Sequence, residues 1–192
     1  MKKMFIMAGL LLAGFSTVNA QDITTPKHSE NVGSQPIQKG NWMVGGSVGA
    51  LGYSFESENF NINFMPRAGY FISDGIAIGL GIDLGFSTVK NGDNIWGYGI
   101  KPFARYYFPE GASATGRFFG QVDLGVTGGS EGTADTSFAF GINGGYAHFI
   151  SRNVALEVTA GYNYSKSQSA NATAQNGLGA AIGFQIYLEG NK

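Results

Sequence analysis

The chain has 192 residues, a formal net charge of −1 and no cysteine, so it fits one domain without disulfides, thiolate nucleophiles or cysteine metal sites. Charged residues make up 13% of the chain, whereas the surface of a soluble domain usually carries roughly 25–35% charged residues. Beyond residue 20, no continuous apolar run is long enough to form a membrane-spanning helix.

The first residues have the pattern of a cleaved secretory signal. Two lysines precede an apolar run from Met4 to Phe15, and the small residue Ala20 closes the segment. The run has about twelve residues, whereas a membrane-spanning helix needs about twenty. We therefore predict a signal peptide over residues 1–20 that is removed after Ala20. Loss of its two lysines changes the net charge from −1 to −3, so the mature chain lacks the basic surface that nucleic-acid binding requires.

Residues 21–40 are predicted to form a flexible periplasmic leader. The segment is polar, contains Pro26 and Pro36 and has no usable hydrophobic periodicity. His28 lies within it, and no second metal ligand stands near it at a ligand spacing, so we interpret His28 as a solvated residue.

The remaining residues, 41–192, alternate between apolar residues and small or polar ones. In the clearest segment, Ile76 to Val89, six large apolar residues alternate with Ala77, Asp83 and three glycines. This period of two predicts a β-strand, because the apolar residues of a helix recur every three or four positions. About thirteen tilted residues rise roughly 30 Å, more than the roughly 25 Å apolar band of an outer membrane. Eight such segments are predicted, at residues 42–54, 58–72, 76–88, 95–108, 117–127, 136–150, 154–166 and 176–188.

The aliphatic face of this strand is predicted to point into lipid. In a soluble barrel of the lipocalin type it would fill the core, and the face left to water would consist largely of glycine and alanine. The low charge content of the chain argues against that arrangement. In a membrane barrel the aliphatic face needs no polar cover, and small inward residues let a narrow barrel close around a few large polar side chains.

The connections between the predicted strands differ in length. Residues 73–75 and 151–153 form tight turns, whereas the segments at 89–94, 128–135 and 167–175 are longer and polar. Outer-membrane barrels show this asymmetry, with short periplasmic turns and longer external loops. The connection at 109–116 fits the asymmetry least well.

An internal repeat supports a meandering strand order. Residues 71–78, FISDGIAI, recur four strands later as residues 149–156, FISRNVAL. The same turn in the same strand context is what an up-and-down meander requires. We predict an all-β fold, an eight-stranded antiparallel up-and-down transmembrane β-barrel over residues 41–192.

The signal, the eight amphipathic strands and the repeated aromatic-Ile-Ser turn resemble the small outer-membrane β-barrel family of the OmpX, OmpA-domain and opacity-protein type. The resemblance covers residues 40–188. Gln21 resembles signal junctions common in the Bacteroidetes, and the chain does not end in the phenylalanine that is typical of proteobacterial barrels. The resemblance implies a place in the outer membrane of a Gram-negative bacterium, contact with its lipid and lipopolysaccharide, and insertion by the barrel assembly machinery.

The inward face of the predicted strands carries three cations and three anions. A charge on the lipid face would cost about 2–4 kcal/mol near the membrane midplane, which favours inward placement. Five polar residues are predicted to complete the hydrogen bonds inside, namely Asn61, Asn63, Gln121, Asn143 and Gln185. Side chains fill eight-stranded barrels, so we favour a polar plug, with a narrow conduction path as the alternative. The predicted lumen charge network consists of Arg67, Asp83, Lys101, Arg105, Asp123 and Glu157.

A serine motif and a histidine raise the question of catalysis. Residues 45–49 match the G-x-S-x-G nucleophile pattern, but they lack its strand-turn-helix context. His148 is predicted at the periplasmic interface, equivalent to Tyr70 in the repeated hairpin. We therefore predict no enzyme activity, no cofactor and no metal site.

The sequence thus predicts a monomeric outer-membrane protein with a structural or surface-interaction, adhesin-like role. The first alternative is a small porin or channel for small solutes, and the second is a lipid-modifying enzyme of the outer membrane. Aromatic girdles are predicted at the two interfaces, one of Trp42, Tyr70, Tyr106, Phe108 and His148, the other of Tyr53, Phe60, Phe86, Trp96 and Tyr164.

Overall fold

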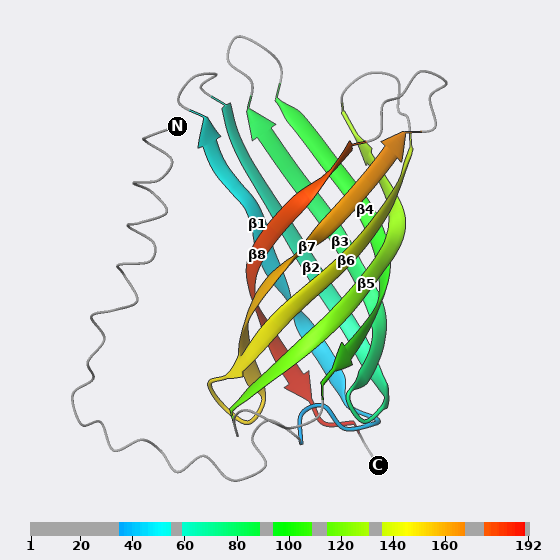
Figure 1. The fold of residues 1–192 in the computed structure, drawn as a ribbon, viewed down its shortest axis with the longest axis vertical. Coiled ribbons are helices and arrows are strands. Elements are labelled where there is room, and N and C mark those ends of the chain that lie inside the picture. Colours follow the sequence, from blue (N-terminus) through cyan, green and yellow to red (C-terminus); the bar gives the residue numbers. More distant parts are fainter. Residues whose placement is uncertain are drawn as a thin grey trace, which may run out of the picture.

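Eight antiparallel strands follow one another in sequence order around a closed barrel, and the first strand pairs with the last (Figure 1). The computed structural model describes residues 35–54, 59–88, 94–108, 115–130, 136–167 and 175–190. The strands are β1 (Trp42–Ser54), β2 (Asn59–Ser73), β3 (Ile76–Thr88), β4 (Ile95–Tyr107), β5 (Gly116–Gly129), β6 (Ser137–Phe149), β7 (Val154–Ser167) and β8 (Gln175–Leu188). Each strand begins and ends within two residues of its predicted bounds, so the predicted fold is confirmed.

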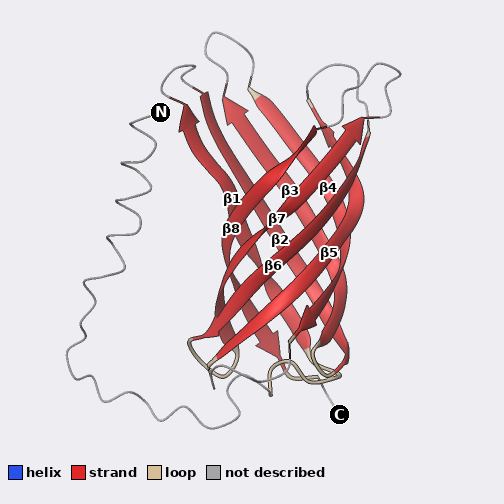
Figure 2. Cartoon of the chain, viewed as in Figure 1, coloured by secondary structure: helices blue, strands red, loops and turns tan. Residues whose placement is uncertain are grey.

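Strands make up nearly all of the described structure, as Figure 2 shows. No helix within the described ranges is long and apolar enough to cross a membrane. The predicted signal peptide and most of the connection at 109–116 lie outside the described residues. The cleavage after Ala20 therefore stays a prediction.

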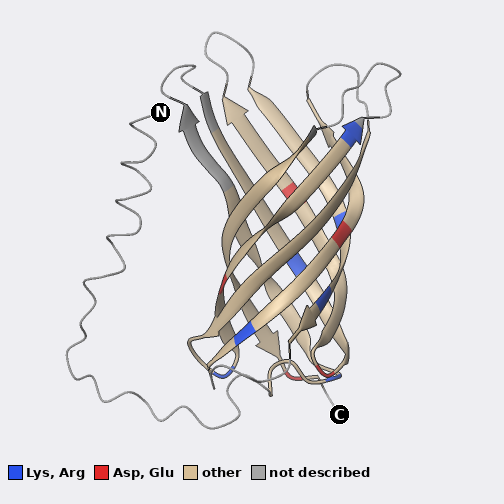
Figure 3. Ribbon diagram, in the orientation of Figure 1, with Lys and Arg blue, Asp and Glu red and all other residues tan. Residues whose placement is uncertain are grey.

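The two faces of β3 show why the chain closes into a barrel. Ile78, Leu80 and Leu84 expose 46–48% of their surface on the outside, whereas Ala77 is fully buried and Asp83 is 9% exposed. The predicted direction of the aliphatic face is thus confirmed. The same outward apolar surface runs around the other strands, and charged positions on the wall are few (Figure 3). In a soluble protein this apolar surface would be exposed to water, at a free-energy cost of about 25 cal/mol per Å².

Inward residues alternate in size from strand to strand, which is how a narrow barrel holds large side chains. Phe119 pairs across β5 and β6 with Gly145. A Cβ atom at Gly145 would lie 2.4 Å from the Phe119 ring. Arg67 pairs with glycines on both sides, Gly45 of β1 and Gly81 of β3. A larger residue at position 145 would therefore clash with the Phe119 ring, and the two glycines beside Arg67 place no side chain next to it.

The turn at Asp74 and Gly75 has the conformation that its residues favour. Gly75 has a φ of 72°, the left-handed region that glycine adopts at little cost. Its carbonyl oxygen accepts a hydrogen bond from the Tyr107 amide at 2.8 Å, which ties the turn to β4. This turn, the turn at residues 150–153 and both ends of the described chain lie at one end of the barrel (Figure 1). We call it the short-turn end and the opposite one the loop end.

Residues 35–40 fold across the short-turn end, whereas the sequence predicts a flexible leader up to residue 40. Ile37 is 9% exposed and belongs to the buried apolar cluster. Its carbonyl oxygen accepts a hydrogen bond from Gly75 N at 2.8 Å, and Lys39 N donates to Asp74 Oδ1 at 2.7 Å. Periodicity could not reveal this contact, because a single apolar residue in a polar segment has no period.

Outward aromatic residues gather at both ends of the wall. At the short-turn end, the ring centroids of Trp42 and Tyr70 lie 5.0 Å apart, and those of Tyr146 and His148 lie 6.4 Å apart. Near the loop end, the Phe86 and Trp96 centroids lie 4.6 Å apart. The side chains of two predicted girdle residues, Tyr53 and Phe60, are outside the described part of the structure.

Candidate functional site in the barrel lumen

Aromatic side chains fill the lumen at the short-turn end, below the polar interior that the sequence predicts. Phe71, Tyr107, Phe119, Phe149 and Tyr187 are each at most 2% exposed. The Tyr107 and Tyr187 hydroxyl oxygens lie 2.8 Å apart, so one donates a hydrogen bond to the other across the lumen. The polar plug is therefore only part of the interior. Strand alternation puts these rings on the same face as Arg105, and that signal could have identified them in the sequence.

A buried ion pair lies directly on this aromatic layer. Arg105 of β4 donates from Nη1 to Glu157 Oε1 of β7 at 2.7 Å. The two side chains are 0% and 2% exposed. Arg105 also donates to the Tyr107 hydroxyl at 2.9 Å, and its guanidinium carbon lies 4.0 Å from the centroid of the Phe119 ring. A charge pair so far from water is retained only when hydrogen bonds and packing compensate for its desolvation.

Gln121 of β5 connects this layer to the rest of the lumen. Its Oε1 accepts hydrogen bonds from Arg105 Nε at 2.7 Å and from Arg67 Nη1 at 3.2 Å. Its Nε2 donates to Asp123 Oδ1 at 2.6 Å. One neutral amide thus bridges two guanidinium groups and a carboxylate. The sequence predicts Gln121 only as a residue that fills remaining hydrogen bonds.

A second ion pair lies nearer the loop end. Lys101 Nζ contacts Asp83 Oδ2, with side chains 25% and 12% exposed. Asn63 Nδ2 donates to the other Asp83 oxygen, Oδ1, at 2.6 Å. The partial exposure of Lys101 means that water reaches this level of the lumen, unlike the level of Arg105.

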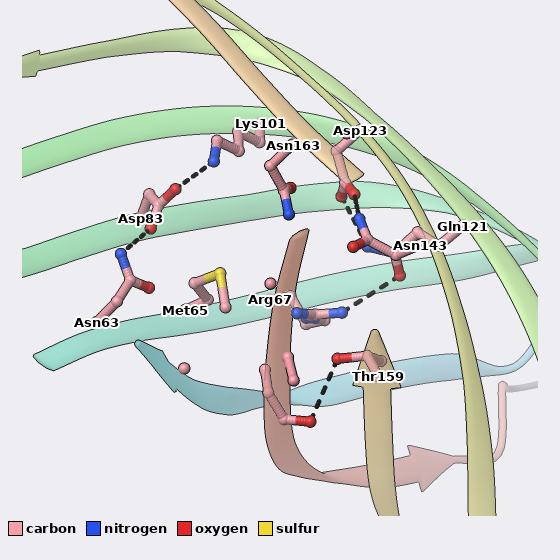
Figure 4. A pocket seen from close by; sticks show the side chains of 15 residues that line it. Asn63, Met65, Arg67, Asp83, Lys101, Gln121, Asp123, Asn143, Thr159 and Asn163 are labelled. Carbon is pink, nitrogen blue, oxygen red and sulfur yellow. Dashed lines mark hydrogen bonds and ion pairs between the residues drawn. The ribbon is translucent and has the colours of Figure 1, made fainter. Parts of the chain in front are cut away.

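A cavity of about 270 Å³ occupies the lumen above the Arg105 layer (Figure 4). Four of the six predicted network residues line it, namely Arg67, Asp83, Lys101 and Asp123. Small residues such as Gly141, Gly179 and Ala181 form the rest of its wall together with polar amides. Among the described residues, buried aromatic side chains therefore occupy the lumen at the short-turn end, and the cavity lies toward the loop end.

The six predicted residues all point into the barrel, but they do not form one network of ion pairs. The structure joins Arg105 to Glu157 and Lys101 to Asp83. Within the described residues, Arg67 and Asp123 have no ion-pair partner and instead bond to neutral groups. Arg117 is a seventh inward-facing charged residue, which the sequence prediction omits. It is 4% exposed and donates to the Gly116 carbonyl at 2.9 Å.

Comparison with solved structures identifies the architecture. The solution structure of outer membrane protein H from Pseudomonas aeruginosa matches with a TM-score of 0.57 at 13% identity, over 77% of this chain and 99% of that protein. Neisserial surface protein A matches with a TM-score of 0.55 at 17% identity, over 79% and 97%. The N-terminal β-barrel domain of Pseudomonas aeruginosa OprF matches with 0.52 at 13% identity, over 78% and 98%. This chain has the fold of the small outer-membrane β-barrels. The predicted resemblance is thereby confirmed at the level of fold.

Comparisons of the amino-acid sequence give no match. No protein-family model matches the chain, and no curated protein matches it. The likeness to the solved barrels is below 20% identity in each case, so it concerns the architecture and carries no ligand or activity with it.

The serine motif of this chain, residues 45–49, lies within strand β1 of the barrel wall. Ser47 is 6% exposed and its hydroxyl oxygen accepts a hydrogen bond from Arg67 Nη2 at 2.9 Å. His148 stacks on Tyr146 on the outer face of the barrel, whereas Ser47 faces the lumen. The described residues contain no group of three or more side chains suited to hold a metal ion. Ser47 is thus a hydrogen-bond partner of the lumen arginine, and none of the described residues contacts its hydroxyl as the base that a serine nucleophile requires.

Proposed function

We propose that this protein is a closed outer-membrane barrel with a structural or surface-interaction role, and that it does not conduct solutes through its lumen. The observation that carries the proposal is the two-part plug at the short-turn end. Buried aromatic rings fill the cross-section there, and the Arg105–Glu157 pair covers them. An ion crossing this level would have to displace packed rings and break a buried ion pair.

The outward surface supports a place in the outer membrane. On the outer wall, Ile82 of β3 and Val122 and Leu124 of β5 expose 44–50% of their surface. Lipid covers such a surface at no cost, and closed barrels satisfy every backbone hydrogen bond within the membrane. We propose outer-membrane lipid and lipopolysaccharide as its surroundings, insertion by the barrel assembly machinery, and a monomeric, non-catalytic state.

The first prediction concerns the membrane itself. The full chain expressed in a Gram-negative host is expected in the outer-membrane fraction, and its gel mobility is expected to change when the sample is heated, because a folded barrel is more compact than its unfolded chain. The measurement is fractionation followed by electrophoresis of heated and unheated samples. Recovery of the folded protein as a monomer without detergent would contradict the proposal.

The second prediction concerns conduction. The detergent-refolded protein, reconstituted into planar bilayers, is expected to give no regular current steps, because the aromatic layer has no aqueous path through it. Flotation of parallel vesicles shows that the protein has inserted, so silence cannot be explained by failed insertion. A reproducible unitary step in these bilayers would favour the alternative, a small channel.

A further inference from the structure

The lumen cavity holds two opposite charges, Arg67 and Asp123, neither of which forms an ion pair with the described residues. Arg67 of β2 donates from Nη1 to Gln121 and from Nη2 to Ser47, both of them neutral. Asp123 of β5 accepts one hydrogen bond at each oxygen, from Gln121 Nε2 at 2.6 Å and Asn143 Nδ2 at 2.9 Å, again from neutral groups. Ionisable groups at membrane depth are costly, and their retention without an ion pair points to a function.

The bonding capacity that remains on these two groups is complementary. A guanidinium carries five N–H donors in a planar fork, so Arg67 keeps donors suited to a carboxylate. Each Asp123 oxygen keeps a lone pair that can accept from an ammonium group. Gln121 contacts both residues through opposite atoms of one amide, which sets their spacing (Figure 4). That spacing suits a molecule whose carboxylate and ammonium lie a few bonds apart, with one hydrogen bond added at each end.

The cavity has the size and access that such a molecule needs. Its volume is about 270 Å³, against the roughly 30 Å³ that each water occupies in the liquid, so a small metabolite fits and a large one does not. The aromatic layer closes the short-turn end, so entry is from the loop end. Asn63 lines the same cavity, and its buried Oδ1 accepts no hydrogen bond from the described residues.

The geometry points to a binding site for a small zwitterion, with its carboxylate on Arg67 and its ammonium group on Asp123. The chemical class is that of a short α-amino acid. Lys101 and Asp83 line the same cavity but neutralise each other. The charges left for a ligand are therefore one cation, Arg67, and one anion, Asp123, which favours a ligand of zero net charge. This inference goes beyond the proposed function and does not depend on it, since a closed barrel can still bind from one end.

The test is a titration of the full, refolded protein in detergent micelles at pH 7 with three probes. Glycine carries both charges, acetate only the negative one and methylammonium only the positive one. The side-chain amide resonances of Gln121 and Asn143 report on the cavity. Saturable shifts are expected with glycine, and binding of acetate and of methylammonium is expected to be at least tenfold weaker. Equal affinity for acetate and glycine would overturn the zwitterion assignment, as would the absence of saturable shifts with glycine.

Variants locate the site within the lumen. Arg67→Gln and Asp123→Asn are each expected to weaken glycine binding at least tenfold, whereas Lys166→Gln, an exposed cation outside the cavity, is expected to leave it unchanged. Ala181→Leu fills the cavity without altering any charge and is expected to abolish binding. Unchanged glycine binding in folded Ala181→Leu would overturn the inference. The titrations of the unmodified protein with glycine, acetate and methylammonium need no variant. They therefore test the inference even if a charge variant fails to fold.

This titration and the bilayer measurement fail independently. Binding without current steps agrees with both the site and the closed barrel. Current steps with glycine binding would contradict the closed lumen and leave the site intact. Silence without glycine binding would contradict the site and leave the closed barrel intact.

Discussion

Replacing Arg105 with alanine is expected to lower the free energy of unfolding by about 3–5 kcal/mol, since removal of one partner leaves the other charge buried without compensation. Glu157 is 2% exposed, and the Arg105 guanidinium lies 2.7 Å from it. The variant also removes the cation from the Phe119 ring and one of the two arginine donors from Gln121. Water entering the space would reduce the loss, and about 1–2 kcal/mol would still agree with the structure.

The measurement is equilibrium unfolding in detergent or lipid, with Lys166→Ala as the matched control. Lys166 is exposed on β7, and truncation of an exposed charge usually changes stability by less than about 0.5 kcal/mol. The double variant Arg105→Met with Glu157→Gln removes both charges and is expected to recover part of the loss. Together with the single variants Arg105→Met and Glu157→Gln it completes the cycle that measures the coupling. Equal and negligible losses for Arg105→Ala and Lys166→Ala would mean that Arg105 is not buried.

Phe119→Ala is expected to cost about 3–5 kcal/mol, because it opens a cavity in the closing layer of the lumen. The Phe119 side chain is 1% exposed, and its ring centroid lies 5.5 Å from that of Tyr107. Gly145 opposite cannot fill the space, since it has no side chain to move into it. The Arg105 guanidinium would lose its aromatic neighbour at the same time.

The adjacent residue supplies the control for this prediction. Phe118 is the same residue type one position earlier, and its side chain points outward with 57% exposure. Phe118→Ala leaves no enclosed cavity, because lipid or detergent occupies the vacated space, and it is expected to cost less than half as much as Phe119→Ala. Unfolding of the two variants under identical conditions tests the register of β5. A larger loss for Phe118→Ala would reverse the inward and outward assignment of that strand.

Together these two variants probe what separates the closed end of the lumen from the hollow one. Arg105 and Phe119 belong to the buried layer that fills the lumen at the short-turn end. Arg67 and Asp123 belong to the cavity above it. Stability and binding are therefore expected to respond to different residues of one lumen, although Gln121 contacts both groups.

The sequence by itself determined the number of strands, their bounds and the face of each residue. These features are local, because successive side chains of an extended backbone point to opposite sides. Ile78 and Asp83 illustrate this point: the first is 47% exposed and the second 9%. The inward direction of all six predicted charges followed from the same alternation.

The tertiary structure decided which inward groups meet. Arg105 and Glu157 are 52 residues apart and not on neighbouring strands, so the stagger of the closed barrel alone brings them to one level. The same stagger leaves Arg67 without an ion pair among the described residues and gathers the aromatic rings into one layer. The contact of Ile37 with the Gly75 turn likewise depends on tertiary structure. Alternation defines a face, whereas height along the barrel depends on how all eight strands are offset against one another.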